Sequence, residues 1–361
     1  MGLVVKNIQP KSLFFHIVVP VSMAVALAAL CAFAQSPAVD SPEQALKTKT
    51  ELVKLDVTVL DSNGNFAEGL KEQDFHVSDD GAEQPILYFA PVTDAAKVVV
   101  VLETSPSVYL IKNEHIAAAY SLLKGLSADD EVALVTYSDV PRNAMPFTTN
   151  KAQLLSALGS ADYMIGSGAL NLYYTVSSVV DGLARFPGKK AIILLTTGLD
   201  SSPRSQWTKL TQKLRESDVV IFSVGLLGPL TNTLADDQKH SKHVPGGSAF
   251  DSGDLRSDPT LQKANQGLTA LATITGGQAY FPASGSEFAP VYRQIAACLR
   301  NEYVIGIAPG HDGQFHHLMV TVGGADTVPS QKKEKHKKKK KEHGEAQYRV
   351  SFRQGYIAPV S

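Results

Sequence analysis

The chain has 361 residues, of which 44% are hydrophobic and 19% are charged, and its formal net charge is −1. This is the composition of a globular protein with one large core or two smaller ones. The balanced charge excludes a chain that binds nucleic acid through an overall positive charge.

The first 34 residues have the pattern of an export signal. Lys6 and Lys11 precede an apolar run that ends in "AFAQ", with small Ala32 and Ala34 placed for cleavage before Gln35. The pattern predicts a signal peptide at 1–34. The protein is therefore expected to be exported, and to be periplasmic, envelope-associated or secreted.

Two alternatives to a cleaved signal stay open. The apolar run is close to the length of a membrane anchor, about 18 residues, and Cys31 would suit lipid attachment except that bulky Leu30 precedes it. If cleavage follows Ala34, Cys298 is the single cysteine of the mature chain, which excludes an internal disulfide. Its apolar surroundings, "VYRQIAACLR", predict a buried core residue.

Residues 35–50 are polar, contain two prolines and are predicted to be a linker. The next segment, 51–93, alternates apolar and polar residues and contains the turn sequences "DSNGN" and "SDDGAE", which predicts antiparallel strands. A second β segment is predicted over 301–361. Each has too few strands to be stable alone, so we expect the two to pair into one small β unit.

Apolar runs alternate with helical patterns between residues 97 and 300. The predicted strands are "KVVVVLET", "DEVALVTYSD", "KKAIILLTTG", "VVIFSVGL" and "QAYF", and segments with helical spacing of apolar residues follow or separate them. This order predicts an α/β domain with a mostly parallel central sheet and helices on both faces.

Two segments do not fit the alternation. Residues 228–262 are rich in Gly, Ser, Asp and Pro and are predicted to be a long loop, either functional or disordered. The Lys-rich loop 331–345 has eight lysines between Lys332 and Lys341 and is predicted to be a solvated extension of a hairpin. An alternative is contact with an anionic envelope surface. The run contains no aromatic residues for base stacking, so no specific nucleic-acid partner is expected.

Oxygen-bearing side chains follow the predicted parallel strands. Ligands of such sheets gather at the carboxyl ends of the strands, and carboxylate and hydroxyl oxygens from separate loops suit Mg²⁺ or Ca²⁺. The residues at these strand ends are Glu103, Thr104, Ser105 and Ser107 after the first strand, Asp139 after the second, and Thr196, Thr197 and Asp200 after the third.

Several of these segments resemble a known family. "ETSPS" resembles the D-x-S-x-S of von Willebrand factor type A domains, and "AIILLTTGLD" resembles their "LLTDG-x-D" strand. The leader "LDVTVLDSNGNFAEGLKEQDFHVSDDGAEQPILYF" and the closing "LATITGGQAYFP", "LRNEYVIGIAP" and "YRVSFRQGYIAP" are similar to the VWFA-related family first named from acidobacteria. The resemblance covers about 50–360. It implies a Rossmann-like core of the von Willebrand type, which generally binds proteins, often through a metal-ion-dependent adhesion site.

Carried over by position, that adhesion site would use Glu103, Ser105 and Ser107. The family's ligand threonine falls on Leu170, and its last carboxylate falls on Thr197. Asp200 matches a second aspartate that does not usually contact the ion. Because Mg²⁺ needs near-ideal octahedral geometry, these departures predict a degenerate site that has lost the ion. Rescue of the site by an inward shift of Asp200 is an open alternative.

The predicted function is an exported, non-enzymatic protein-binding or adhesion module without a cofactor. Its unknown protein ligand would bind the loops 103–109, 139–147, 166–171 and 197–206. One alternative is an adhesin that uses Mg²⁺ or Ca²⁺ at Glu103, Ser105 and Ser107. The other is an envelope hydrolase with Ser105 as nucleophile, although the sequence near it offers no His or Lys base. His240 and His243 are expected to be incidental, and His311, His316 and His317 to be surface residues.

Overall fold

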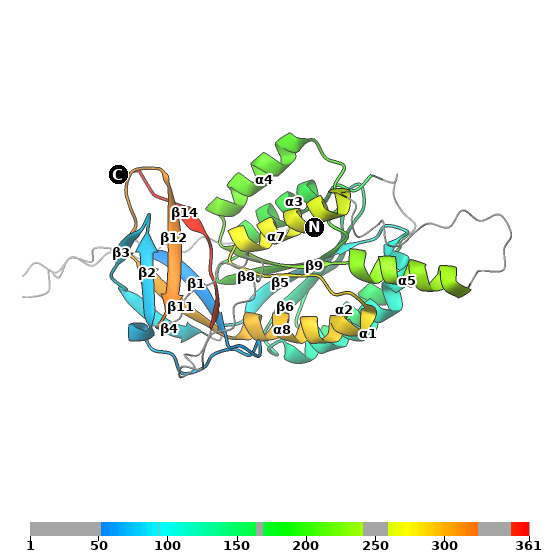
Figure 1. Cartoon of the computed structure of the whole chain (residues 1–361), viewed down its shortest axis with the longest axis horizontal. Coiled ribbons are helices and arrows are strands. Elements are labelled where there is room, and N and C mark those ends of the chain that lie inside the picture. Colours follow the sequence, from blue (N-terminus) through cyan, green and yellow to red (C-terminus); the bar gives the residue numbers. More distant parts are fainter. Residues whose placement is uncertain (1–51, 93, 164–168, 241–258, 324–347, 361) are drawn as a thin grey trace, which may run out of the picture. The chain divides into compact units, whose positions relative to one another are not determined.

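A computed structural model gives the fold of residues 52–92, 94–163, 169–240, 259–323 and 348–360 (Figure 1). The predicted signal 1–34, linker 35–50 and Lys-rich loop 331–345 lie outside these described residues.

The centre of the fold is a six-stranded sheet in the order β10-β9-β8-β5-β6-β7. β5, β6, β8, β9 and β10 are parallel. Every residue of β8 and all but one of β5 are buried, because helices cover both faces. The strands are β5 (Ala96–Glu103), β6 (Glu131–Tyr137), β7 (Pro141–Thr148), β8 (Lys189–Thr196), β9 (Val219–Gly225) and β10 (Ala279–Tyr280).

The helices form a layer on each face of this sheet (Figure 1). One layer contains α1 (Lys112–Gly125), α2 (Lys151–Ser160), α5 (Leu227–His240) and α8 (Phe288–Arg300), and the other contains α3 (Leu172–Ala184), α4 (Arg204–Glu216) and α7 (Pro259–Ile274). Two short 3₁₀ helices, η2 (Val108–Ile111) and η3 (Gly285–Glu287), precede α1 and α8. The predicted three-layer α/β core is confirmed, and Cys298 is buried in it as expected.

The prediction that residues 139–147 form a loop is wrong. Most of it is β7, which pairs antiparallel with β6 at the outer edge of the sheet and runs away from the carboxyl ends of the parallel strands. Its sequence, "PRNAMPFT", has two prolines and no apolar run. An edge strand tolerates this because one side of its backbone needs no partner, and the register shift near Leu134 is the irregularity that such prolines accompany.

The predicted loop 228–262 is also wrong in its first part, because residues 227–240 form α5. Gly228 and Pro229 look like helix breakers in the sequence. However, they lie in the first turn, where the backbone N–H groups have no partner within the helix and proline is tolerated. Residues 241–258 lie outside the described part of the chain.

The N- and C-terminal segments pair with each other, as predicted, and they make two antiparallel four-stranded sheets, β13-β1-β11-β4 and β14-β12-β2-β3. The first contains β1 (Val53–Leu60), β4 (Tyr88–Val92), β11 (Glu302–Ile307) and β13 (Arg349–Ser351). The second contains β2 (Phe75–Asp79, after the 3₁₀ helix η1, Glu72–Asp74), β3 (Ala82–Gln84), β12 (Phe315–Val322) and β14 (Gly355–Ile357).

A shared apolar core joins these two sheets into one β unit. Tyr303 of β11 lies at its centre, with its ring 5.1–5.6 Å from the rings of Phe66, Phe75 and Phe89. The Tyr303 hydroxyl donates to the Ala67 carbonyl at 2.7 Å, so the polar end of this buried ring is satisfied. Strands from both ends of the chain are therefore needed to close this core.

A buried ion pair lies where the α/β core meets the β unit. Lys189, the first residue of β8, and Glu302, the first residue of β11, are 2.9 Å apart, and their side chains are 6% and 4% exposed. The Lys189 ammonium also donates to the Leu299 carbonyl. Burial raises the pKa of the Glu302 carboxyl to about 7, against the opposing charge of Lys189.

Candidate functional site

The carboxyl ends of β5, β6, β8 and β9 meet at one edge of the central sheet, called here the carboxyl edge. Glu103 ends β5, and Thr196 and Thr197 lie at the end of β8 beside it. The backbone N–H and the hydroxyl of Thr104 both donate to the Tyr137 carbonyl, at 2.8 and 3.1 Å, which holds the end of β5 against β6. The parallel register thus brings together side chains that are about ninety residues apart in the sequence.

The Glu103 carboxylate is fully buried and accepts hydrogen bonds on both oxygens. Oε2 accepts from the Thr196 hydroxyl at 2.9 Å, and from the Thr197 N–H and hydroxyl at 2.8 Å each. Oε1 accepts from the Ser105 hydroxyl at 2.7 Å. These four donors compensate the burial of a negative charge without a cation.

Tyr137 is a site residue that the sequence interpretation missed. Its hydroxyl lies 2.6 Å from Thr196 Oγ1 and 3.3 Å from Glu103 Oε2. The Tyr137 hydroxyl donates to Glu103 Oε2, and in its shorter contact with Thr196 Oγ1 either hydroxyl can be the donor, so Tyr137 extends the chain of hydrogen bonds. Burial, and then the charge of Glu103, raises the pKa of Tyr137, so its hydroxyl stays a donor. In the sequence, Tyr137 could have been recognised as a site residue only from its position at the end of a neighbouring parallel strand.

The other predicted site residues have separate roles. Ser107 is exposed, directly precedes η2 and makes no side-chain cap. Asp200 Oδ1 accepts from the Tyr173 N–H at 3.1 Å and so caps the start of α3, while its Oδ2 accepts from the Ser202 N–H at 2.8 Å. Leu170 exchanges hydrogen bonds with Ser201 through its backbone. Of the strand-end residues named from the sequence, Glu103, Ser105, Thr196 and Thr197 share one hydrogen-bonded cluster.

Asp139 does not join that cluster either. Its Oδ1 lies 3.0 Å from the Arg142 guanidinium, and the hydrogen bond from Arg142 lowers the pKa of Asp139. Its backbone carbonyl accepts from the Asn171 side chain at 2.5 Å, which ties the start of β7 to the start of α3. Asp139 therefore organises the loops of the carboxyl edge and leaves Glu103 as the buried acid.

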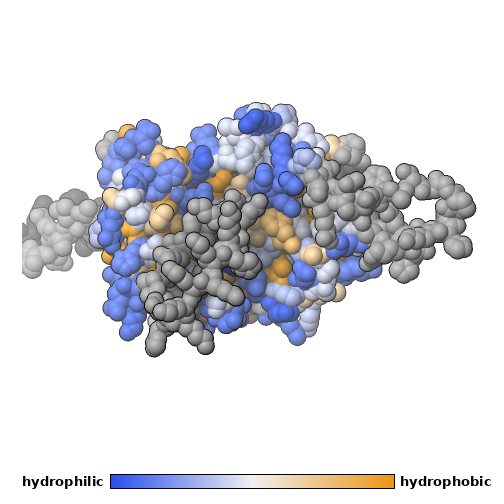
Figure 2. Space-filling model, in the orientation of Figure 1, coloured by the Kyte–Doolittle hydropathy of each residue, from blue (hydrophilic) through white to orange (hydrophobic). Residues whose placement is uncertain are grey.

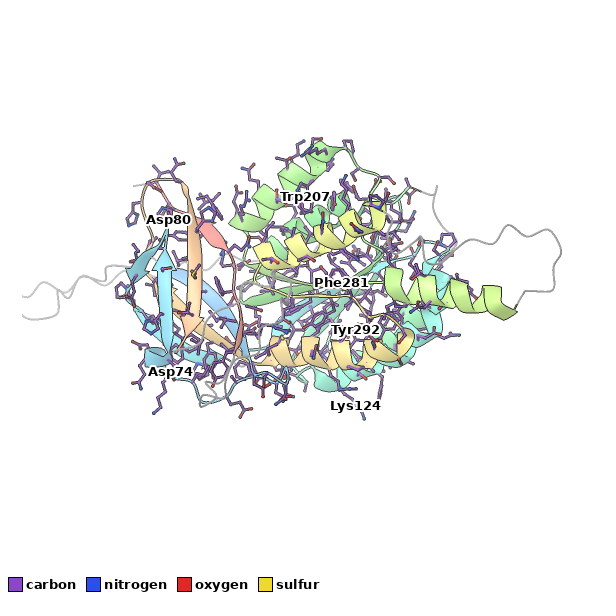
Figure 3. All side chains as sticks on the ribbon, in the orientation of Figure 1. Asp74, Asp80, Lys124, Trp207, Phe281 and Tyr292 are labelled. Carbon is purple, nitrogen blue, oxygen red and sulfur yellow. The ribbon has the colours of Figure 1, made fainter. Side chains whose placement is uncertain are left out.

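Large apolar side chains are exposed on the segments that form the carboxyl edge. Figure 3 marks Phe281, which follows β10, near the start of α5, and α5 in turn packs beside η2. In Figure 2 a hydrophobic strip lies between the two helix layers in this region. The exposed residues are Tyr109 and Leu110 of η2, Val140 before β7, Tyr174 of α3 and Phe281, each 43–50% exposed.

A second group of possible metal ligands lies in the β unit. Asp79, Asp80 and His316 place three ligand atoms within 4.8 Å of one another. His316, expected to be a surface residue, is half-buried: its side chain is 15% exposed and contacts carboxylates on both ring nitrogens. His311 and His317 are exposed as expected. The side chains of His240 and His243 lie outside the described residues.

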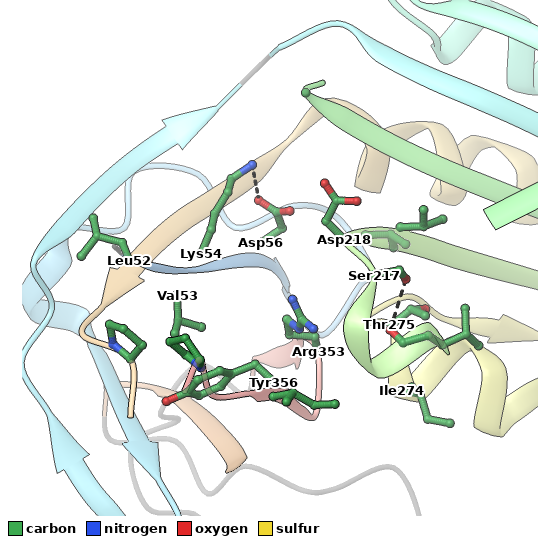
Figure 4. A pocket seen from close by; sticks show the side chains of 17 residues that line it. Leu52, Val53, Lys54, Asp56, Ser217, Asp218, Ile274, Thr275, Arg353 and Tyr356 are labelled. Atoms are coloured by element: carbon green, nitrogen blue, oxygen red, sulfur yellow. Dashed lines mark hydrogen bonds and ion pairs between the residues drawn. The ribbon is translucent and has the colours of Figure 1, made fainter. Parts of the chain in front are cut away.

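A cleft of about 310 Å³ lies between the β unit and the α4–β9 side of the core (Figure 4). Its charged lining residues already have partners in the protein. Lys54 pairs with Asp56 at 3.1 Å, and Asp218 pairs with Lys190 at 2.5 Å. The Arg353 guanidinium donates to the carbonyls of Gly355 and Arg215 at 2.9 and 2.6 Å. Because these charged groups are already paired, the cleft is a polar contact region between the β unit and the α/β core.

No helix among the described residues is both long and apolar enough to cross a membrane.

Comparison with known proteins identifies the core. The family model of the von Willebrand factor type A domain matches residues 97–258. No curated protein matches the sequence.

Several solved structures are similar to parts of the chain. Proximal thread matrix protein 1 from the mussel byssus is 16% identical over 58% of this chain, with a TM-score of 0.39, and the match spans 50% of the mussel protein. A von Willebrand factor type A protein from Catenulispora acidiphila is 11% identical over 77% of this chain and 72% of its own, with a TM-score of 0.41. The corresponding domain of the type V pili tip protein Mfa5 from Porphyromonas gingivalis is 14% identical over 57% of this chain and 95% of its own, with a TM-score of 0.40.

The sheet order, the two helix layers and the family match agree on the central part of the chain. Residues 97–258 of this chain therefore match the von Willebrand factor type A domain, and the described residues of that range lie in the α/β core.

Proposed function

We propose that this protein is an exported, non-enzymatic protein-binding module whose carboxyl edge binds a protein ligand without a metal ion. Von Willebrand factor type A domains are adhesion or protein-interaction modules, and some of them use a metal site. The observation that carries the metal-independent mode is the Glu103 carboxylate, whose two oxygens accept five hydrogen bonds from the protein itself.

The residues at the other ligand positions support this mode. Leu170 has no side-chain oxygen, and the Thr197 hydroxyl donates to Glu103, so neither adds a negative charge to hold an ion. Mg²⁺ is bound by carboxylates in a nearly undistorted octahedral shell. A single carboxylate whose oxygens already accept hydrogen bonds does not provide such a shell. The exposed apolar side chains of the carboxyl edge would supply the binding energy instead, since aromatic anchors dominate protein interfaces.

The hydrolase alternative has no support among the described residues. The Ser105 hydroxyl donates to Glu103, and no histidine or lysine contacts it in the described part of the chain. A serine nucleophile needs a general base held by a third group, and the Glu103 carboxylate is already stabilised by three other donors.

A capture experiment tests the binding mode. The chain without residues 1–34 is immobilised and incubated with envelope proteins of the source organism, with and without excess EDTA. We expect the same partner to be retained in both conditions. A Tyr109→Ser/Phe281→Ser variant should lose roughly tenfold or more of the partner, because it removes two aromatic anchors.

Met319→Ser is the matched control, because Met319 is equally exposed but lies on β12 of the β unit. It should retain the partner fully. Loss of the partner in EDTA would show a metal-dependent adhesin. Equal retention by the edge variant and the control would show that the carboxyl edge is not the binding surface.

Export is a separate part of this proposal and rests on the segment 1–34. Expression of the full chain in a bacterial host, followed by mass spectrometry of the envelope and secreted fractions, should find a chain that begins at Gln35. A chain that keeps residues 1–34 in the membrane fraction would indicate an anchor, and a full-length cytoplasmic chain would contradict export.

A further inference from the structure

At the turn between β2 and β3, the carboxylates of Asp79 and Asp80 lie beside the imidazole of His316. Asp80 and Gly81 have φ angles of +48° and +84°, the left-handed conformation of a tight hairpin turn. The Asp80 N–H donates to the His317 carbonyl at 2.8 Å, and the His317 N–H donates to Asp80 Oδ1 at 2.9 Å. These bonds fix Asp80 at the end of the hairpin, where Figure 3 marks it.

Three potential ligand atoms converge at this point. His316 Nδ1 lies 2.8 Å from Asp79 Oδ1 and 3.4 Å from Asp80 Oδ2. Ligands around a tetrahedral zinc ion with bonds of about 2.0–2.1 Å are roughly 3.4 Å apart. The Asp79–His316 pair would therefore need to open by only about half an ångström to admit such an ion.

The groups that hydrogen-bond to these potential ligands are arranged as they are around a bound metal ion. His316 Nε2 lies 3.1 Å from Asp312 Oδ1, so this carboxylate can hold the proton on Nε2 and leave the Nδ1 lone pair toward Asp79 and Asp80. The Tyr356 hydroxyl donates to Asp79 Oδ2 at 2.8 Å and leaves Oδ1 to face the histidine. Carboxylates and hydrogen-bond donors in these positions orient the ligands of metal sites.

The charge of the group also favours a cation. Three carboxylates, from Asp79, Asp80 and Asp312, surround one imidazole, and no lysine or arginine of the described chain pairs with any of them. Even a protonated His316 would offset only one of the three negative charges. Asp79 is 7% exposed, so solvent screens its charge poorly.

We propose that Asp79, Asp80 and His316 bind a divalent transition-metal ion of the zinc class, with Asp312 and Tyr356 orienting the ligands. Mixed imidazole and carboxylate donors suit zinc, whereas Mg²⁺ prefers oxygen donors alone. The ion would join β2, the β2–β3 turn and β12, and so hold the sheet β14-β12-β2-β3 together. This site lies in the β unit and is independent of the carboxyl edge.

The test is the thermal stability of the full chain after removal of metals with EDTA. One equivalent of Zn²⁺ should raise the melting temperature by roughly 5 °C, as expected for a tightly bound ion, and Mg²⁺ should not. His316→Gln should abolish the zinc shift. His317→Gln is the matched control, since this neighbouring side chain is exposed and outside the group, and it should keep the shift.

Asp312→Ala gives a second, milder variant, because Asp312 is exposed and its loss leaves the three ligands in place. It should weaken zinc affinity about 10- to 100-fold, and it decides the question if His316→Gln does not fold. A zinc shift that persists in His316→Gln would overturn the proposal, since other histidines would then bind the ion. Absence of any zinc shift in the wild-type chain would also overturn it, and a protonated His316 would then account for the geometry.

Discussion

Glu103→Ala is expected to lower the free energy of unfolding by about 3 kcal/mol, measured by chemical denaturation. The substitution removes a buried acceptor and leaves the hydroxyls of Thr196, Thr197 and Ser105 and the Thr197 N–H without their partner. A metal site would respond in the opposite way. Without its ion, a cluster of ligands gains stability when a carboxylate is removed, because the repulsion between the ligands decreases.

Two further variants separate the charge of Glu103 from its shape. Glu103→Gln keeps an acceptor oxygen and should lose about half as much stability as Glu103→Ala. Ser107→Ala is the control at the same edge and should change stability by less than about 0.5 kcal/mol, because Ser107 is exposed and makes no side-chain cap.

Addition of Mg²⁺ or Mn²⁺ completes this test. Neither ion should cause a shift in melting temperature that depends on Glu103, because the oxygens of Glu103 already accept hydrogen bonds. A shift of several degrees that disappears in Glu103→Ala would establish a working adhesion site and contradict the metal-independent mode.

Lys189→Met is expected to lower the free energy of unfolding by about 3–5 kcal/mol at pH 8, because it leaves the Glu302 carboxylate buried without its partner. Loss of the ammonium raises the pKa of Glu302 further above its folded value of about 7 and its unfolded value of 4.5. A carboxyl whose pKa is raised by folding stabilises the protein below the unfolded pKa, and that contribution is lost as the pH rises. The defect of Lys189→Met should therefore be smaller at pH 5 than at pH 8.

The double variant Lys189→Met/Glu302→Leu is the matched control. It replaces the pair by apolar side chains of similar size, so its stability should return to within about 1 kcal/mol of the wild type. The difference between pH 5 and pH 8 should also disappear. If Lys189→Met costs less than about 1 kcal/mol at pH 8, the pair does not hold the two parts of the fold together.

The helices and parallel strands of the core were predictable because their pattern is local. Continuous β-branched apolar runs such as "KVVVVLET" and "KKAIILLTTG" are typical of strands buried on both faces, and the helical spacing between them predicts crossover connections. The two errors, at β7 and α5, have a local cause as well. Pro141 and Pro146 made an edge strand look like a loop, and Gly228 and Pro229 did the same for the first turn of a helix. Proline and glycine are tolerated at both places because the backbone there lacks hydrogen-bond partners.

The candidate site was predictable in its location and only partly in its chemistry. The rule that parallel strands end at one edge placed Glu103 beside Thr197. It could not show that Tyr137 and Thr196 extend the hydrogen bonds around Glu103, because that depends on side-chain directions across neighbouring strands. The cluster that contains Asp79 and His316 could not be predicted from the sequence for the same reason. Its members are 237 residues apart and meet only through the pairing of β2 with β12.

The sequence by itself determined the α/β alternation and the pairing of the terminal β segments, since these follow from residue type and spacing. Its resemblance to the type A family implies in addition that a ligand hydroxyl is missing at Leu170 and a ligand carboxylate at Thr197. The tertiary structure alone decided what the remaining acid at position 103 does. Whether a buried carboxylate needs a metal ion depends on how many donors reach its two oxygens, and three of the donors to Glu103 come from the end of a strand more than ninety residues away. In this protein they are close enough to hydrogen-bond with Glu103 Oε2.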